Sequence, residues 1–336
     1  MKILFVYANP LGIPYYDFGI GSLASLLKSK NHQIELLDFT FGMSLKKGVK
    51  QARNFNPDII LFSSRTNEFT DVVKISQALK QELQKPIFCG GIHPIIAPED
   101  SIAHFDGVCI GEGEDAILEL VNNIETSKDY TQTQGFWFKK DNEIIKNPLS
   151  SLTNSLDKYP FPDRGIFDYK KYLRARNYQL DFITSRGCPF KCSYCVNHTL
   201  QQLYKGKGNY LRNYSIPFVI KELKKLKTQY KIKTIFFLDE TFNWNKARLR
   251  EFSEAYKKEI NLPYECCLRA DLCDEEVFQY LKDSNCYKVD IAIESGNPTT
   301  RKELLDKPIS DQQIVNAFRL ARKYGITSMS YNMVGL

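Results

Sequence analysis

The sequence predicts an α/β protein with two parallel sheets that follow one another along the chain. In both halves of the 336-residue chain, short β-rich runs alternate with segments of helical periodicity. Such alternation is typical of parallel sheets wrapped by helices. The length favours about two domains, and a proline-punctuated stretch lies between the halves. We therefore expect a first domain over residues 1–125, a hairpin and linker over 126–180, and a second domain over 181–336.

Five β-rich runs supply the expected strands of the first domain, and they cover residues 3–7, 33–37, 58–62, 86–89 and 107–110. The segments 21–27 and 72–83 have helical periodicity. Ligands of open parallel sheets bind beyond the carboxyl ends of the strands, and glycines there let a large ligand approach the backbone. The candidate binding residues at these ends are Asn9, Gly12, Ser63, Ser64, Gly90, Gly91, Gly111, Glu112 and Gly113.

The connecting region begins with residues 135–145, where two β-rich arms flank polar residues, which predicts a hairpin. Three prolines, Pro148, Pro160 and Pro162, then indicate an extended linker. We expect the linker aromatics, such as Tyr159, to pack against the second domain.

The second domain resumes the alternation. Its expected strands are 181–185, 233–238, 264–269, 288–293 and 327–334, and its expected helices are 215–229, 245–259, 274–283 and 311–324.

The charge, the apolar runs and the cysteine content indicate which partners and which compartment to expect. The net charge is +7, from 46 Lys and Arg against 39 Asp and Glu. The lysines are scattered or lie in helix-like stretches such as 221–227, which indicates a solvated face, so no nucleic-acid partner is expected. No apolar run approaches the roughly 20 residues of a membrane helix, and the apolar N-terminal run is too short for a signal peptide. A cytoplasmic protein is expected, and nine cysteines fit a reducing compartment.

Three cysteines, Cys188, Cys192 and Cys195, lie on one short segment with the spacing C-x3-C-x2-C. Three thiolates can hold three irons of a 4Fe–4S cluster and leave the fourth iron open. A zinc site is the alternative, with His198 as fourth ligand, but it would place four ligands on one loop without a second knuckle. Disulfides are disfavoured because nothing else indicates secretion.

This motif, with Tyr194 before its last cysteine, resembles the signature of radical S-adenosylmethionine (SAM) enzymes. The resemblance implies a partial (β/α)6 barrel in which the open iron chelates SAM and one electron cleaves SAM to a 5′-deoxyadenosyl radical. It also implies an electron donor such as flavodoxin or ferredoxin. Because only five strands are expected before Leu336, the barrel is predicted to be truncated after its fifth strand.

The resemblance also assigns SAM contacts at strand ends. Asp239 and Glu240 match a motif that accepts the SAM amino group, and an ammonium needs such acceptors. Glu294 matches the residue that takes the ribose hydroxyls, and Tyr194 is placed beside SAM. Arg269 could pair with the SAM carboxylate in a bidentate way. Without the cysteines, each acid would be interpreted as a helix cap or an exposed charge.

The first domain resembles the cobalamin-binding domain that precedes the barrel in a subgroup of radical SAM proteins, with a flavodoxin-like sheet. The glycine pairs at 90–91 and 111–113 carry the resemblance most specifically. The chain lacks the Asp-x-His-x-x-Gly motif, so no lower axial histidine is expected. We expect the exposed His93 to be a surface or hydrogen-bonding residue, not a cobalt ligand. The alternative is a sheet without cobalamin that contacts a substrate or partner.

The remaining cysteines show no ligand spacing and are expected to be small buried residues. They are Cys89, Cys109, Cys266, Cys267, Cys273 and Cys286. With only two of them in the first domain, a second three-cysteine cluster like that of methylthiotransferases is excluded.

The sequence therefore predicts a cobalamin-dependent radical SAM enzyme, with methyl transfer to an unactivated carbon of a small-molecule substrate as the favoured reaction. The cofactors would carry the radical and methyl chemistry while the protein positions them. The alternatives are a radical SAM cyclase, oxidase or rearrangement enzyme, and a truncated, non-catalytic binding protein. The sequence names neither the substrate nor a further catalytic residue.

Overall fold

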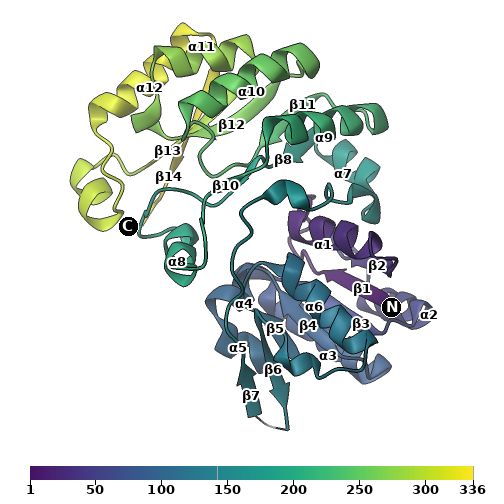
Figure 1. Cartoon of the computed structure of the whole chain (residues 1–336). Helices are drawn as coiled ribbons and strands as arrows, with labels where there is room; N and C mark the ends of the chain where they lie inside the picture. The colour runs from purple at the N-terminus through teal and green to yellow at the C-terminus, as the bar shows by residue number, and fades with distance from the viewer. Residues whose placement is uncertain (142, 336) are drawn as a thin grey trace. The chain divides into compact units, whose positions relative to one another are not determined.

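The computed structural model describes residues 1–141 and 143–335. It contains two compact units (Figure 1). The first comprises Met1–Leu152 and Tyr159–Tyr172, and the second comprises Thr153–Lys158 and Leu173–Leu336. No helix among the described residues is long and apolar enough to cross a membrane.

The first unit is built on a seven-stranded sheet with the order β2-β1-β3-β4-β5-β6-β7. Its first five strands are parallel and confirm the prediction to within about one residue at each end. The order 2-1-3-4-5 is that of flavodoxin-like sheets. The strands are β1 (Lys2–Tyr7), β2 (Gln33–Asp38), β3 (Ile59–Ser63), β4 (Ile87–Gly90), β5 (Gly107–Cys109), β6 (Phe136–Lys140) and β7 (Glu143–Lys146).

Helices cover both faces of this sheet, with α1 packed beside α6 and α2 beside α3. In β1, the apolar residues 3–7 are all buried because both faces are covered, which is typical of parallel sheets. The helices are α1 (Phe18–Lys28), α2 (Leu45–Phe55), α3 (Phe69–Leu83), α4 (Ile92–Ile96), α5 (Pro98–Ile102) and α6 (Gly113–Glu125).

The predicted hairpin forms, as β6 and β7, but it is part of the first sheet instead of the linker. Strand β6 pairs with β5 in an antiparallel register and so covers an edge that would otherwise expose unpaired backbone groups. Residue 142 of its turn lies outside the described residues. The expectation for Tyr159 was wrong, because this ring is buried in the first unit near Glu114 and Asp115 of α6.

The second unit contains a five-stranded parallel sheet with the order β14-β13-β12-β11-β8. The five strands lie side by side in the order in which they follow one another along the chain. Figure 1 shows α9 to α12 along the outer side of this sheet. The elements are β8 (Gln179–Phe182), α9 (Ile216–Gln229), β11 (Thr234–Phe237), α10 (Lys246–Glu259), β12 (Tyr264–Leu268), α11 (Glu275–Asp283), β13 (Cys286–Glu294), α12 (Asp311–Lys323) and β14 (Thr327–Asn332).

Shorter elements not predicted from the sequence complete this unit. The expected strand at 181–185 is divided between β8 and β9 (Ser185–Arg186), and β9 pairs with β10 (Arg212–Asn213) in an antiparallel register. Two helices were also missed: α7 (Tyr169–Ala175), which is divided between the two units at Tyr172, and α8 (Val196–Leu203). Helix α8 begins immediately after Cys195, which occupies its N-cap position.

A cluster of aromatic rings packs around the end of β11, the strand that the two predicted SAM-binding acids follow. Phe237, at the end of β11, lies 5.2 Å from Phe252 of α10 and 5.3 Å from Tyr264 of β12, between ring centroids. Phe237 is fully buried. Edge-to-face aromatic pairs of this kind add stabilisation beyond the area they bury, so the loop after β11 starts from a rigid point.

Candidate active site

The predicted site residues of the second unit lie at the carboxyl ends of its strands. The cysteine loop follows β9, Asp239 and Glu240 follow β11, Arg269 follows β12, and Glu294 ends β13. Because β11, β12 and β13 are parallel strands of one sheet, their carboxyl ends share one edge of it. The cysteine loop follows β9, which comes directly after the parallel strand β8 but pairs with β10 instead.

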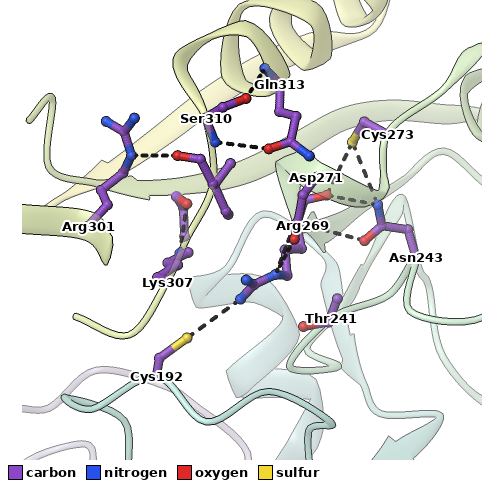
Figure 2. A network of polar contacts seen from close by, with 12 residues as sticks. Cys192, Thr241, Asn243, Arg269, Asp271, Cys273, Arg301, Lys307, Ser310 and Gln313 are labelled. Carbon is purple, nitrogen blue, oxygen red and sulfur yellow. Dashed lines mark hydrogen bonds and ion pairs between the residues drawn. The ribbon is translucent and has the colours of Figure 1, made fainter. Parts of the chain in front are cut away.

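Each predicted cluster cysteine has its own polar neighbour. The Cys188 sulfur lies 3.7 Å from the Thr241 hydroxyl. Asn197 Nδ2 donates to the Cys195 sulfur at 3.4 Å. Cys192 is buried, and its sulfur accepts from the guanidinium of Arg269 at 3.5 Å (Figure 2).

The donor set fits an iron–sulfur cluster. Thiolates of one loop are the ligands such clusters use, and N–H and O–H donors to sulfur are among the groups that tune them. Among the described residues, no three His, Cys, Asp or Glu side chains lie close enough together to hold a metal ion. The three thiols are therefore farther apart in this structure than they would be as ligands of one cluster. Burial raises the pKa of the Cys188 thiol.

His198, the possible fourth zinc ligand, contacts other groups. Its Nδ1 lies 3.1 Å from the Lys191 carbonyl, and its Nε2 lies 2.7 Å from the Gln202 side-chain nitrogen. Both ring nitrogens are therefore engaged away from the cysteine sulfurs, and the structure offers no support for the zinc alternative.

Tyr194, Glu294 and Lys307 form a polar cluster. The Tyr194 hydroxyl donates to Glu294 at 2.7 Å, and the Lys307 ammonium lies 3.0 Å from the same carboxylate oxygen. Glu294 has a φ of 67°, a left-handed conformation that is uncommon for a residue with a side chain. Such local strain persists where the surroundings enforce it and is concentrated at functional sites.

Lys307 was not singled out from the sequence, because only its tertiary contacts mark it. Its ammonium also donates to the Ala292 carbonyl at 2.7 Å. Arg301, at 1% exposure, fixes this segment by donating to the carbonyls of Ser295 and Ile309 and pairing with Asp311. It lies in a π-helical turn, Thr300–Leu304, a geometry frequent at functional sites.

The cysteine loop is attached to this same turn. Ser193 donates through its backbone N–H to the Leu305 carbonyl at 3.0 Å and through its hydroxyl to the Leu304 carbonyl at 2.6 Å. Tyr194, the next residue, is thereby held against Glu294.

The structure separates the two adjacent acids after β11. Asp239 is 3% exposed and accepts hydrogen bonds from the backbone N–H and hydroxyl of Thr184 and from the Ser185 hydroxyl. Burial raises the pKa of Asp239, and these hydrogen bonds oppose that effect. Glu240, in contrast, is exposed as a residue, although burial of its carboxyl raises the pKa and a hydrogen bond with Asn197 opposes that rise. Asp239 thus holds the segment that leads into the cysteine loop, and Glu240 is the acid that can accept an incoming ammonium.

Arg269 is 8% exposed and makes contacts other than the predicted bidentate pair. Its Nε lies 2.8 Å from a carboxylate oxygen of Asp271, and its guanidinium carbon lies 3.7 Å from the centre of the Phe190 ring. Its NH1 donates to Cys192. The backbone of Arg269 is held on both sides by the buried Asn243, whose amide oxygen accepts from its N–H at 3.0 Å and whose amide nitrogen donates to its carbonyl at 3.1 Å.

The other cysteines are mostly buried, as expected. Cys267 is the exception and is half-buried. Cys286 begins β13, at the end opposite the site, and Cys273 accepts from Asn243 at 3.6 Å.

In the first unit, the predicted cobalamin loops meet at the carboxyl edge of the sheet. The strand order reverses between β1 and β3, and ligands bind at such a switch point. Asn9 is buried after β1 and donates to the Ile13 carbonyl at 2.7 Å and to the Thr40 hydroxyl at 2.8 Å. Gly12 closes the turn by donating its N–H to the Asn9 carbonyl at 3.0 Å.

The loops after β3 and β4 are tied together. Ser64 donates its N–H to the Gly90 carbonyl at 2.9 Å, and the Ser63 hydroxyl donates to Asp17 at 3.0 Å. Gly91 has a φ of 98°, and a Cβ at this position would lie 2.6 Å from the Ser64 carbonyl oxygen. Only glycine fits there.

The loop after β5 leads into a helix. Gly111 is buried, Glu112 occupies the N-cap position of α6, and Gly113 is its first residue. His93 is buried in the short helix α4, not exposed as expected, but its hydrogen-bonding role is confirmed. Its Nδ1 lies 3.2 Å from the Thr66 hydroxyl and its Nε2 lies 3.2 Å from Asp100.

Replacing Gly91 with alanine is expected to destabilise the first unit by at least about 1 kcal/mol more than replacing Gly42. Positive φ strains both variants, but only Gly91 adds a backbone clash, and overpacking costs about 1–3 kcal/mol. Gly42 is the matched control, since its φ of 78° is also positive but a Cβ there would meet nothing within 4 Å. Urea unfolding of both variants measures the difference. Equal destabilisation would contradict the steric argument.

Comparison with family models assigns both units. Residues 182–336 match the radical SAM superfamily, and residues 6–121 match the B12-binding domain. The two matches confirm the expected cofactors of the family, which are a 4Fe–4S cluster, SAM and cobalamin.

Individual relatives cover nearly the whole chain. An uncharacterized methyltransferase of Pyrococcus horikoshii is 29% identical over 334 residues, which are 97% of this chain and 69% of the relative. The cytidylyl-2-hydroxyethylphosphonate methyltransferase of Streptomyces wedmorensis is 24% identical, over 96% of this chain and 69% of the relative.

Two solved structures share the fold. The cobalamin-dependent radical SAM enzyme OxsB matches with a TM-score of 0.82 at 21% identity, over 99% of this chain and 49% of its own. The radical SAM methyltransferase TsrM of Kitasatospora setae also matches with a TM-score of 0.82, at 19% identity, over 100% of this chain and 69% of its own. The chain thus spans about half of the OxsB chain. The chain thus carries a radical SAM domain that follows an N-terminal B12-binding domain.

Proposed function

We propose that this chain is a cobalamin-dependent radical SAM methyltransferase that acts on an unactivated carbon of a small-molecule substrate. The observation that carries the proposal is the presence, in one chain, of a three-cysteine loop at the carboxyl edge of one parallel sheet and a glycine-rich switch point on another. The names of the two methyltransferase relatives support the reaction type.

We assign Cys188, Cys192 and Cys195 as the cluster ligands. When bound, the cluster, SAM and cobalamin supply the radical and the methyl group. The protein positions these groups: Ser193 attaches the cysteine loop to the π-helical turn, and Asp239 holds the strand end before it. We further propose that the five strands form part of a partial (β/α)6 barrel.

The SAM contacts follow from charge and exposure. Glu240 is exposed and accepts the SAM amino group, while Glu294 accepts the ribose hydroxyls. Lys307 and the Tyr194 hydroxyl orient the Glu294 carboxylate, since both contact its Oε1. The half-exposed ring of Tyr194 is a surface on which the nucleoside can pack.

Cobalamin is assigned to the carboxyl edge of the first sheet. The loop after β1 leaves the large apolar side chains of Leu11 and Ile13 exposed, at 65% and 43%. Apolar surface exposed beside a switch point favours a large ligand there. Because both nitrogens of His93 have partners, we propose that cobalt receives no histidine from this helix.

Cobalamin binding and product mass together test the proposal. The protein, purified without oxygen and incubated with cobalamin, is expected to retain it after gel filtration, as read from its absorbance spectrum. A variant with the residues 9–14 in scrambled order is the control. Cobalamin retention no better than that of this control would contradict the cobalamin assignment. A product without the mass of one added CH2 would contradict methyl transfer.

A second candidate is a radical SAM cyclase. The chain is 26% identical, over 93% of its length, to an anaerobic magnesium-protoporphyrin IX monomethyl ester cyclase of a Synechocystis species. Ring closure without an added CH2 would identify it. Either reaction needs an external one-electron reductant, for which we propose flavodoxin or ferredoxin in the cytoplasm.

A further inference from the structure

We propose that Arg269 sets the reduction potential of the 4Fe–4S cluster through the sulfur of Cys192. The inference rests on the proposed function only in that the three cysteines hold the cluster. It concerns a positioning and charge effect of this side chain and assigns no contact with SAM.

Arg269 is the buried cation beside the cysteine sulfurs. Its NH1 donates to the Cys192 sulfur at 3.5 Å (Figure 2). The hydrogen-bonding partners of the other two sulfurs, Thr241 and Asn197, are uncharged. Cys192 is the most buried of the three cysteines, at 8% exposure. A charge acts most strongly where solvent does not screen it.

Two contacts fix the side chain of Arg269, and a third residue fixes its backbone. Asp271 pairs with its Nε at 2.8 Å, the Phe190 ring stacks on its guanidinium, and Asn243 holds its backbone on both sides. A two-point pair with a carboxylate uses two neighbouring nitrogens along one edge of the guanidinium, either Nε with NH2 or NH1 with NH2. Asp271 contacts Nε and the Cys192 sulfur contacts NH1, so each of these edges already has one nitrogen engaged. This geometry favours the sulfur contact over the SAM carboxylate.

Reduction adds one electron, taken from an external low-potential donor, and makes the cluster one unit more negative. A nearby positive charge and an N–H donor to a ligand sulfur stabilise this reduced form relative to the oxidised form. Arg269 therefore raises the reduction potential. Asp271 carries the opposite charge and partly offsets the effect.

The two residues give a test with opposite signs. Arg269→Gln is expected to make reduction at least about tenfold less favourable, which lowers the one-electron potential by about 59 mV. Asp271→Asn, which leaves the arginine charge uncompensated, is expected to raise the potential. A general loosening of the site would shift both variants in the same direction.

The measurement is a redox titration of the cluster-loaded, SAM-free protein with dithionite, followed by electron paramagnetic resonance. Arg250→Gln is the matched control, since it removes the same charge from an exposed helix position paired with Glu254. Arg269→Lys, which retains the charge without the planar fork, is expected to lower the potential by less than Arg269→Gln, and it decides the matter if the glutamine variant binds no cluster.

The potentials decide the proposal separately from catalysis. Unshifted potentials in the Arg269 variants, or shifts of the same sign for Arg269→Gln and Asp271→Asn, would overturn it. A loss of SAM binding in Arg269→Gln with an unchanged potential would assign the arginine to SAM instead. If the variants show the expected shifts but the cluster-loaded native protein does not cleave SAM, the proposed function is contradicted and the present inference still holds.

Discussion

Replacing Cys192 with alanine is expected to abolish both cluster loading and SAM cleavage. Two cysteines of the loop would remain, and they cannot hold the three irons that leave a single iron open for SAM. The substitution also leaves the buried guanidinium of Arg269 without its sulfur acceptor. Iron content and absorbance after anaerobic reconstitution measure loading, and 5′-deoxyadenosine formation measures cleavage.

Cys286→Ala is the matched control for this variant. Cys286 is also a buried cysteine of the second unit, but it begins β13, at the end of the sheet opposite the cysteine loop. It is expected to load iron as the native chain does. Full loading in Cys192→Ala would show that the cluster is held elsewhere, and equal loss in both variants would show that the loss is not specific to the cysteine loop.

Replacing Glu294 with glutamine is expected to weaken SAM binding at least tenfold, or by about 1.4 kcal/mol. Glutamine keeps the size of the side chain but removes the negative charge that accepts from both Tyr194 and Lys307. The buried Lys307 then lacks its counter-charge, and the carboxylate assigned to the ribose hydroxyls is lost. Calorimetric titration of SAM into the cluster-loaded, oxidised protein measures the affinity.

Glu303→Gln controls for the loss of one acidic charge nearby. Glu303 lies in the adjacent π-helical turn, and its side chain is exposed. We expect native SAM affinity for this variant, and thermal unfolding confirms that both proteins are folded. Native affinity in Glu294→Gln would remove Glu294 from the SAM site.

Most of the fold followed from local pattern, because the five parallel strands of the first unit are apolar or β-rich runs separated by segments of helical periodicity. The exceptions depend on tertiary pairing. The hairpin was recognised, but its pairing with β5 could not be inferred, since nothing local distinguishes an edge partner from a free hairpin. The helices α7 and α8 have only 7 and 8 residues, and so short a segment is where helical periodicity is least informative.

The site was predictable only where residues of a motif are close in sequence. The cysteine spacing placed three sulfurs on one loop, but the partners of two of them, Thr241 and Arg269, come from distant segments. Lys307 is an ordinary lysine in the sequence, and its burial against Glu294 exists only in the folded chain. Likewise, Asn243 shows its role only through the backbone of Arg269.

Two adjacent acids of one motif also differ in burial, which the sequence could not show. Asp239 and Glu240 are neighbours with the same chemistry, yet one is buried among three donor groups and the other is exposed. Alternation along an extended segment turns successive side chains to opposite sides. Which of the two side chains is buried is set by the packing around the strand end, not by the motif.

Reductive cleavage of SAM by the native chain tests the central claim most directly. The cluster-loaded protein, reduced with dithionite under anaerobic conditions, is incubated with SAM, and 5′-deoxyadenosine is quantified by mass spectrometry against Cys192→Ala. We expect 5′-deoxyadenosine from the native chain and none from the variant. No 5′-deoxyadenosine from a fully loaded, fully reduced native protein would contradict the assignment of this edge of the sheet as a radical SAM site.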